Sequence, residues 1–122
     1  MSGNADPEVV ERYYEYVDGE AYERMFDLFA PDVTYVRSGP RELDGLEELR
    51  EFYLNERPLR GEHTVEDVLV DGDRVAVRGR YDGVKTTDGE DVTFGFADFL
   101  RFDDDGKIAE RNTFNNMLAE QL

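Results

Sequence analysis

One carboxylic acid stands out because it lies among large apolar side chains in a stretch with strand-like alternation. In residues 91–102, alternate positions from Phe94 to Phe102 would face one side of a strand, and Asp98 is the one acid among them. A buried carboxylate must pair with a cation, become neutral, or act in a pocket. Asp98 therefore either serves a functional site with a raised pKa, or pairs with a neighbouring Arg, or lies at a wet end of the strand.

Tyr13 and His63 are two further side chains that could take part in chemistry. Tyr13 shares the apolar stripe of an expected helix with Val9, Val10 and Val17, so its hydroxyl needs a buried partner and it is interpreted as a core tyrosine. His63, the single histidine, is interpreted as a surface or strand-edge residue. It has no accompanying Ser/Asp arrangement for a hydrolase triad, and one His does not make a typical catalytic zinc site.

An acidic run, Asp103-Asp104-Asp105-Gly106, could suggest a calcium loop. The twelfth position counted from Asp103 is Phe114, however, where a calcium-binding loop requires an acid. The run is therefore interpreted as a polar hairpin turn. The glycines form no phosphate-binding motif between a strand and a helix. We expect neither a metal nor a cofactor.

The composition restricts the possible partners. The chain has 122 residues, no cysteine, and 30 acids against 14 bases, for a formal net charge of −16. Such a charge repels nucleic acid and anionic membrane surfaces, and no apolar run reaches the ~18 residues of a membrane helix. Only Lys85 and Lys107 among the bases are lysines. Abundant acids with few lysines favour a cytoplasmic protein of a cell that accumulates salt, where self-repulsion is screened.

The order of the expected elements is helices first and antiparallel strands later. Asp6-Pro7 is typical of a helix start, and Asp71-Gly72-Asp73 is a hairpin signal. The pattern predicts helices over 7–18, 21–30 and from 45 to before Pro58, with the third capped by Asp44 and Glu47. It predicts a loop at 38–40 and strands over 32–36, 63–70, 74–82, 91–102 and 107–115. This order favours an α+β fold in which a curved sheet covers helices on one face.

Five segments, in this order and spacing, resemble the SnoaL-like polyketide cyclases and ketosteroid isomerases of the nuclear transport factor 2-like superfamily. They are residues 9–13, 28–34, 50–53, 97–102 and 106–108. The resemblance implies a single domain over 1–122 with a curved, mostly antiparallel sheet wrapping three N-terminal helices, a cystatin-like cone. It also implies an apolar cavity between the first helix and the sheet.

The resemblance implies roles for particular residues. Tyr13 falls where the isomerases keep the tyrosine of their oxyanion hole, and Asp98 falls where they keep the protonated aspartic acid that donates the second hydrogen bond. The Asp that serves them as general base has no match, because Arg37 lies nearest to its position. Arg37 would bind an anionic oxygen at the cavity mouth or pair on the surface with Glu42 or another of the 30 acids. Glu42 or Asp44 could replace the base if their loop folds inward.

The function implied is binding of a small hydrophobic carbonyl compound, with isomerase- or cyclase-type chemistry at a Tyr13–Asp98 oxyanion hole. The ligand-binding residues expected around it are Arg37, Phe94, Phe96 and Leu100. The alternative is a non-catalytic ligand-binding or dimerisation module of the same fold. In either case we expect a homodimer through the outer face of the sheet, where Ala97 and Phe99 would otherwise be exposed.

Overall fold

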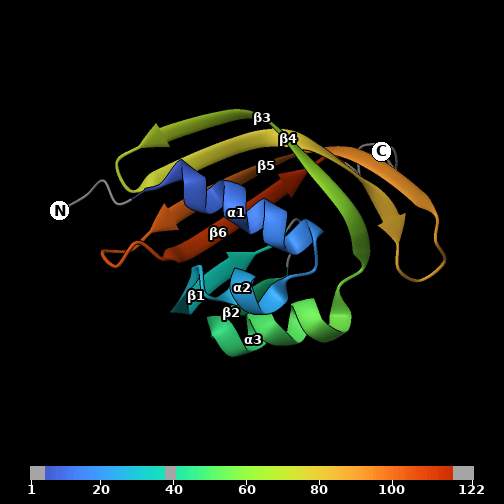
Figure 1. Cartoon of the computed structure of the whole chain (residues 1–122), viewed down its shortest axis with the longest axis horizontal. Helices are drawn as coiled ribbons and strands as arrows, with labels where there is room; N and C mark the ends of the chain where they lie inside the picture. Colours follow the sequence, from blue (N-terminus) through green and yellow to red (C-terminus); the bar gives the residue numbers. More distant parts are fainter. Residues whose placement is uncertain (1–4, 38–40, 117–122) are drawn as a thin grey trace.

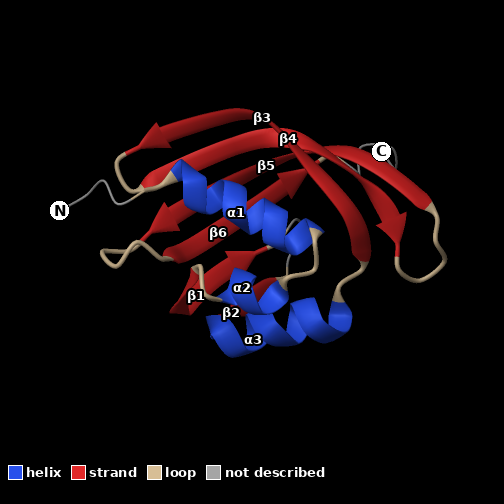
Figure 2. Ribbon diagram, viewed as in Figure 1, coloured by secondary structure: helices blue, strands red, loops and turns tan. Residues whose placement is uncertain are grey.

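A curved sheet wraps around the helices, as the sequence predicts, and it has six strands where five were expected (Figure 2). The computed structural model describes residues 5–37 and 41–116, so the loop expected at 38–40 lies outside the described residues. The strand order is β2-β1-β6-β5-β4-β3. Strands β1 and β6 are parallel, and every other neighbouring pair is antiparallel. The predicted α+β class, with a curved and mostly antiparallel sheet, is confirmed.

Helix α1 (Pro7–Asp18) lies against the concave face of the sheet (Figure 1). It begins as predicted, because the Asp6 side chain accepts a hydrogen bond of 2.9 Å from the backbone N–H of Glu8. Its buried side chains are Val10, Tyr13, Tyr14 and Val17. Helix α1 therefore presents two adjacent tyrosines to the interior, where the expected stripe contained one. None of the helices in the described part of the chain is long and apolar enough to cross a membrane.

Helix α2 (Tyr22–Phe26) is shorter than the predicted 21–30, because strand β1 (Phe29–Val36) begins within that range. Phe29 and Ala30 are buried, and Phe29 is aligned with Ile108 of β6. Pro31 therefore lies inside β1, where proline cannot donate a ladder hydrogen bond. The β1–β6 pairing is irregular between Phe29 and Thr34, and this irregularity accommodates the proline.

A short strand that the sequence pattern did not predict, β2 (Glu42–Asp44), pairs with β1 before helix α3 (Gly45–Glu51). The chain continues through a π-helical segment, η1 (Phe52–Glu56). The predicted cap is corrected: the Asp44 side chain makes no capping bond. Instead its backbone N–H donates to Glu48 Oε1 at 2.9 Å.

The remaining strands are β3 (Leu59–Asp71), β4 (Arg74–Lys85), β5 (Asp91–Phe102) and β6 (Ile108–Asn115). Gly72 has a φ of 61° in the predicted β3–β4 hairpin, a conformation that glycine adopts without strain. In β5, residues Phe96 to Phe102 alternate as predicted, with the even-numbered positions buried. The face carrying Asp98 is thus the concave, helix-covered face.

Strands β3 and β4 are long and must bend to enclose α1. A Cβ at Gly79 would lie 2.3 Å from the carbonyl oxygen of Thr64 and 2.9 Å from the Phe96 ring. The β3–β4 register also shifts between Val65 and Asp67. A glycine at the close approach and a bulge beside it allow these strands to curve, which brings the start of β3 against α1.

Candidate active site

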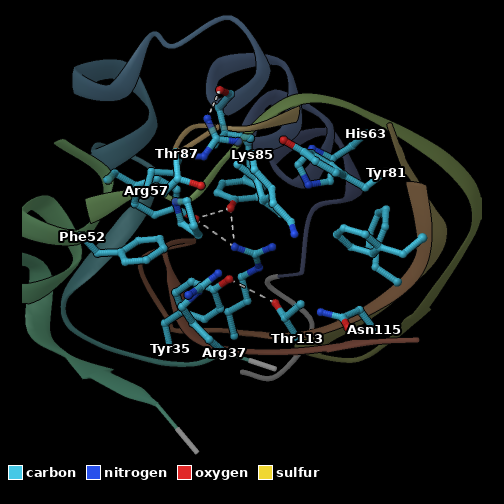
Figure 3. A pocket seen from close by; sticks show the side chains of 18 residues that line it. Tyr35, Arg37, Phe52, Arg57, His63, Tyr81, Lys85, Thr87, Thr113 and Asn115 are labelled. Carbon is cyan, nitrogen blue, oxygen red and sulfur yellow. Dashed lines mark hydrogen bonds between the residues drawn. The ribbon is translucent and has the colours of Figure 1, made fainter. Parts of the chain in front are cut away.

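A cavity of about 380 Å³ lies between α1, η1 and the concave face of the sheet (Figure 3). Tyr and Phe rings line much of it, together with His63 and four basic residues: Arg37, Arg57, Lys85 and Arg111. Of the described residues that line the cavity, none is Asp or Glu. This lining is unusual in a chain with 30 acids and 14 bases.

The structure brings together four of the six side chains that we expected in the site. Tyr13, Arg37, Phe94 and Phe96 line the cavity. Asp98 and Leu100 are not among its lining residues, although both are buried on the same face of β5. Leu100 belongs to the hydrophobic core. Asp98 is bonded to Arg111, a lining residue that the sequence interpretation did not include.

Asp98 forms a two-point ion pair with Arg111 of β6. The Nε and Nη2 atoms of Arg111 lie 3.1 and 2.9 Å from Oδ1 and Oδ2 of Asp98. The Tyr14 hydroxyl donates to Oδ2 at 2.5 Å, and the Thr113 hydroxyl donates to Oδ1. Asp98 is 0% exposed and Arg111 is 3% exposed, so the pair is shielded from water. The interpretation in which Asp98 pairs with a neighbouring Arg is the one that the structure supports.

The expectation of a raised Asp98 pKa is wrong. Burial alone raises the pKa of Asp98, but the Arg111 charge and the hydrogen bonds from Arg111, Thr113 and Tyr14 lower it more, so the net shift is downward. Asp98 is therefore an ionised acceptor at neutral pH. A carboxylate that accepts these bonds cannot donate one to a ligand, unlike the acid that the resemblance implied.

Arg111 is the residue that the sequence interpretation missed. Its Nη1 donates to the hydroxyls of Tyr13 and of Tyr53, the latter at 3.1 Å, and the two hydroxyls lie 2.5 Å apart. The guanidinium carbon also lies 4.5 Å from the ring centroids of both Tyr13 and Tyr35. The alternation of β5 did suggest a cation partner for Asp98, but it did not indicate which Arg.

The Tyr13–Tyr53–Arg111 cluster can donate hydrogen bonds into the cavity. Burial raises the pKa of Tyr13 well above its ordinary value and raises that of Tyr53 to about 12, so both phenols stay protonated at neutral pH. One phenol donates to the other, and Arg111 donates to both oxygens. The second phenolic proton therefore has no acceptor among the described residues and is available to an oxygen in the cavity that both tyrosines line.

Two buried polar atoms of cavity residues have no hydrogen-bond partner among the described residues: Arg37 Nε and the Tyr81 hydroxyl oxygen. The Arg37 guanidinium carbon lies 4.3 Å from the centroid of the Phe52 ring. No contact between Arg37 and Glu42 is found in the described part of the chain, so the surface pairing that we considered is not observed. Unpaired buried polar groups are costly, which favours their use by a bound molecule or water.

His63 lies on the edge strand β3, in agreement with one of the two expected interpretations, but its side chain is not on the surface. Its imidazole lines the cavity, and its side chain is 12% exposed. It contacts Asp18, a residue at the end of α1 that the sequence pattern did not single out.

Comparison with known proteins identifies the family of the chain. Residues 10–111 match the SnoaL-like domain family, so the chain belongs to it, and the resemblance drawn from the sequence is confirmed. No curated protein sequence matches the chain.

Solved structures share the fold at low sequence identity. A protein provisionally named a SnoaL-like polyketide cyclase, from Jannaschia sp., is 22% identical, with a TM-score of 0.81 over 93% of this chain and 87% of its own. A ketosteroid isomerase-like protein from Catenulispora acidiphila, solved with trimethylamine, is 20% identical, with a TM-score of 0.78 over 90% and 86%. An epoxide hydrolase from M. tuberculosis is 16% identical, with a TM-score of 0.79 over 92% and 85%. These likenesses extend to the fold alone.

Proposed function

We propose that this protein binds a small hydrophobic compound with a carbonyl or enolate oxygen in the cavity, and that it performs isomerase- or cyclase-type proton transfer on that compound. The observation that carries the proposal is the lining: aromatic walls, cationic and phenolic donors, and no acid among the described lining residues. Aromatic walls suit a hydrophobic body, and donors aimed at one oxygen stabilise the negative charge that develops there.

The charges of the cavity favour a ligand whose oxygen carries negative charge. Arg111 is neutralised by Asp98, and Lys85 pairs with Glu90 at 3.2 Å. Arg37 has no carboxylate partner among the described residues, and neither has Arg57, whose Nη1 donates to the neutral Tyr22 hydroxyl at 3.0 Å. The cavity therefore keeps a net positive charge inside an acidic protein. An anion or a developing oxyanion is stabilised there by direct contact with guanidinium groups.

The oxyanion hole in this proposal is Tyr13 with Tyr53 and Arg111. Asp98 takes a positioning role instead of the donor role that the resemblance implied. Its two-point bond fixes the guanidinium plane, which places Nη1 beside both phenol oxygens.

Three ligands that share the naphthalene ring system and differ in charge test the proposal. We expect 2-naphthoate and 2-naphthol to bind, and 2-naphthylmethylammonium to bind at least about tenfold more weakly, because a charge-assisted hydrogen bond contributes ~1.5–3 kcal/mol and a cation would face Arg37 and Arg57. Fluorescence titration or calorimetry measures the affinities. Tighter binding of 2-naphthylmethylammonium than of 2-naphthoate would contradict the proposal. Trimethylamine is present in the structure of the Catenulispora protein, so this outcome has to be tested for the present cavity.

The matched variants are Arg37→Met and Arg78→Met. Arg37 lines the cavity, whereas Arg78 is an exposed arginine that pairs with Asp67. We expect Arg37→Met to weaken 2-naphthoate binding about tenfold and Arg78→Met to leave it unchanged. An equal effect of both variants would point to long-range charge and not to direct contact.

We also propose that the protein forms a homodimer through the convex face of the sheet. The register aligns Leu69, Ala76 and Phe99 across β3, β4 and β5. Leu69, Phe99 and Phe114 are 70%, 51% and 57% exposed, and the rings of Phe99 and Phe114 lie 5.8 Å apart. An apolar patch of this kind, opposite the cavity, is typical of an interface.

Light scattering tests the dimer. We expect wild type to be dimeric at tens of micromolar in high salt and Phe99→Glu to be monomeric, because a charge would be buried without a partner. Leu54→Glu is the control, since Leu54 is also exposed, at 47%, but lies on η1. A monomeric wild type would contradict the proposal.

A further inference from the structure

His63 and Asp18 form a bonded pair at the wall of the cavity. The Nδ1 atom of His63 lies 2.6 Å from Asp18 Oδ1, and the backbone N–H of His63 donates to Asp18 Oδ2 at 2.8 Å. Both carboxylate oxygens are thus bound to one residue, 45 positions away in the chain. An ionised carboxylate only accepts hydrogen bonds, so Nδ1 carries a proton, and in the neutral tautomer of the ring Nε2 carries none.

The other ring nitrogen, Nε2, is then the basic one. It has no hydrogen-bond partner among the described residues, and it is not one of the buried unpaired atoms. Tyr14 of α1, Tyr81 of β4 and Phe96 of β5 hold the ring, with centroids 4.8, 4.7 and 5.2 Å away. Asp18 on α1 is the charged group bonded to the ring, and the cavity that the ring lines also contains Arg37, Arg57, Lys85 and Arg111. A fixed imidazole whose second nitrogen is accessible in a ligand cavity is equipped, in its neutral form, to take a proton.

We propose that His63 is the general base of this site and that Asp18 is its positioning residue. The inference rests on the proposed function and supplies the base for which the sequence offered only Glu42 or Asp44. Neither of those acids lines the cavity. His63 does (Figure 3), and so does the Tyr13–Tyr53–Arg111 cluster.

The proton transfer needs no co-reactant, because every proton and electron pair stays with His63 or the substrate. The lone pair of His63 Nε2 takes a proton from the carbon next to the substrate carbonyl. The C–H electron pair becomes the enolate C=C bond, and the carbonyl π pair moves to the oxygen, where the remaining phenolic O–H of the Tyr13–Tyr53 pair, held by Arg111, donates to it. The imidazolium, stabilised by Asp18, then returns a proton to the same carbon or to a conjugated one.

Hydrogen–deuterium exchange of 2-tetralone, a small hydrophobic ketone with acidic α-hydrogens, tests the step. In D₂O we expect wild type to accelerate loss of the α-proton NMR signal, and His63→Gln to reduce that acceleration about 100-fold or more. Binding of 2-naphthol should be retained in His63→Gln, because glutamine leaves the aromatic walls and the Arg111 cluster in place. Exchange that persists in His63→Gln overturns the assignment.

Two outcomes of these experiments distinguish failure of this inference from failure of the proposed function. If 2-naphthol binds but wild type does not accelerate exchange, the base assignment fails and the binding proposal stands. If neither 2-naphthol nor 2-tetralone binds, both fail. Arg78→Met, outside the cavity, should exchange like wild type.

The role of Asp18 can be tested without an activity measurement, through the position of the proton on the His63 ring. Nitrogen-15 NMR of the wild-type imidazole should show the proton on Nδ1 and none on Nε2 at a pH where the ring is neutral. A proton on Nε2 overturns the proposal. Asp18→Asn, whose carbonyl can still accept from Nδ1, should retain more exchange activity than Asp18→Ala, and equal losses in both variants would contradict a positioning role.

Discussion

Replacing Asp98 by asparagine is expected to lower the free energy of unfolding by about 3–5 kcal/mol at pH 7. The change removes the charge that faces Arg111, and a fully buried guanidinium is then left uncompensated. The hydrogen bonds from Tyr14 and Thr113 also lose their ionised acceptor. Urea denaturation of both proteins at pH 7 measures the difference.

The difference in the free energy of unfolding between wild type and Asp98→Asn should depend on pH. The folded pKa of Asp98 is lower than the unfolded one, so the stability that Asp98 contributes is present above the unfolded value of ~3.9. It is lost as the pH falls through the folded pKa. Wild type should therefore lose stability in acid faster than Asp98→Asn, and the two unfolding curves should approach each other at low pH.

The control for this prediction is the exposed pair Arg78–Asp67. Asp67→Asn should change the stability little, because water screens a surface pair. The double variant Asp98→Asn/Arg111→Met should recover part of the loss, since removing both charges leaves no uncompensated one. If Asp98→Asn were as stable as wild type at pH 7, the buried ion pair would not be the element that holds Arg111 in place.

Folding is expected to depend strongly on salt. A net charge of −16 makes the compact state repel itself, and several of the ion pairs of the described residues, such as Arg41–Glu56, are at the surface and contribute little. Raising potassium chloride from ~0.1 to ~1 M shortens the Debye length from ~10 to ~3 Å. We expect the melting temperature to rise by several degrees over this range, at about 4 °C for each kcal/mol gained.

The shape of the salt curve separates screening from solvent exclusion. Screening saturates once the Debye length is shorter than the spacing of surface charges, so the rise should flatten above ~1 M. A rise that begins only above ~1 M and stays linear would indicate exclusion of salt from the protein surface. A melting temperature that does not change between ~0.1 and ~3 M would contradict the proposal that the protein comes from a salt-accumulating cell.

Features that depend on neighbouring residues could be predicted from the sequence. The start of α1, the β3–β4 hairpin and the alternation of β5 were all expected and are observed, because each follows from side chains within a few positions of one another. Helix α2 was predicted too long for the same reason. Its apolar residues fit a helix locally, but pairing of Phe29 with β6 requires a strand there.

The residue types of the site were visible in the sequence, but the partner of each polar group was decided by the tertiary structure. Alternation placed Asp98 on the apolar face, whereas the β5–β6 register decided that Arg111 reaches it and keeps it ionised. The bend of β3 and β4 around α1 decided that His63, although it lies on the edge strand β3, meets Asp18, 45 residues away, and lines the cavity. Ion pairs and hydrogen bonds depend on ångström-scale contacts between distant segments, and only the curvature and register of the folded sheet determine which segments meet.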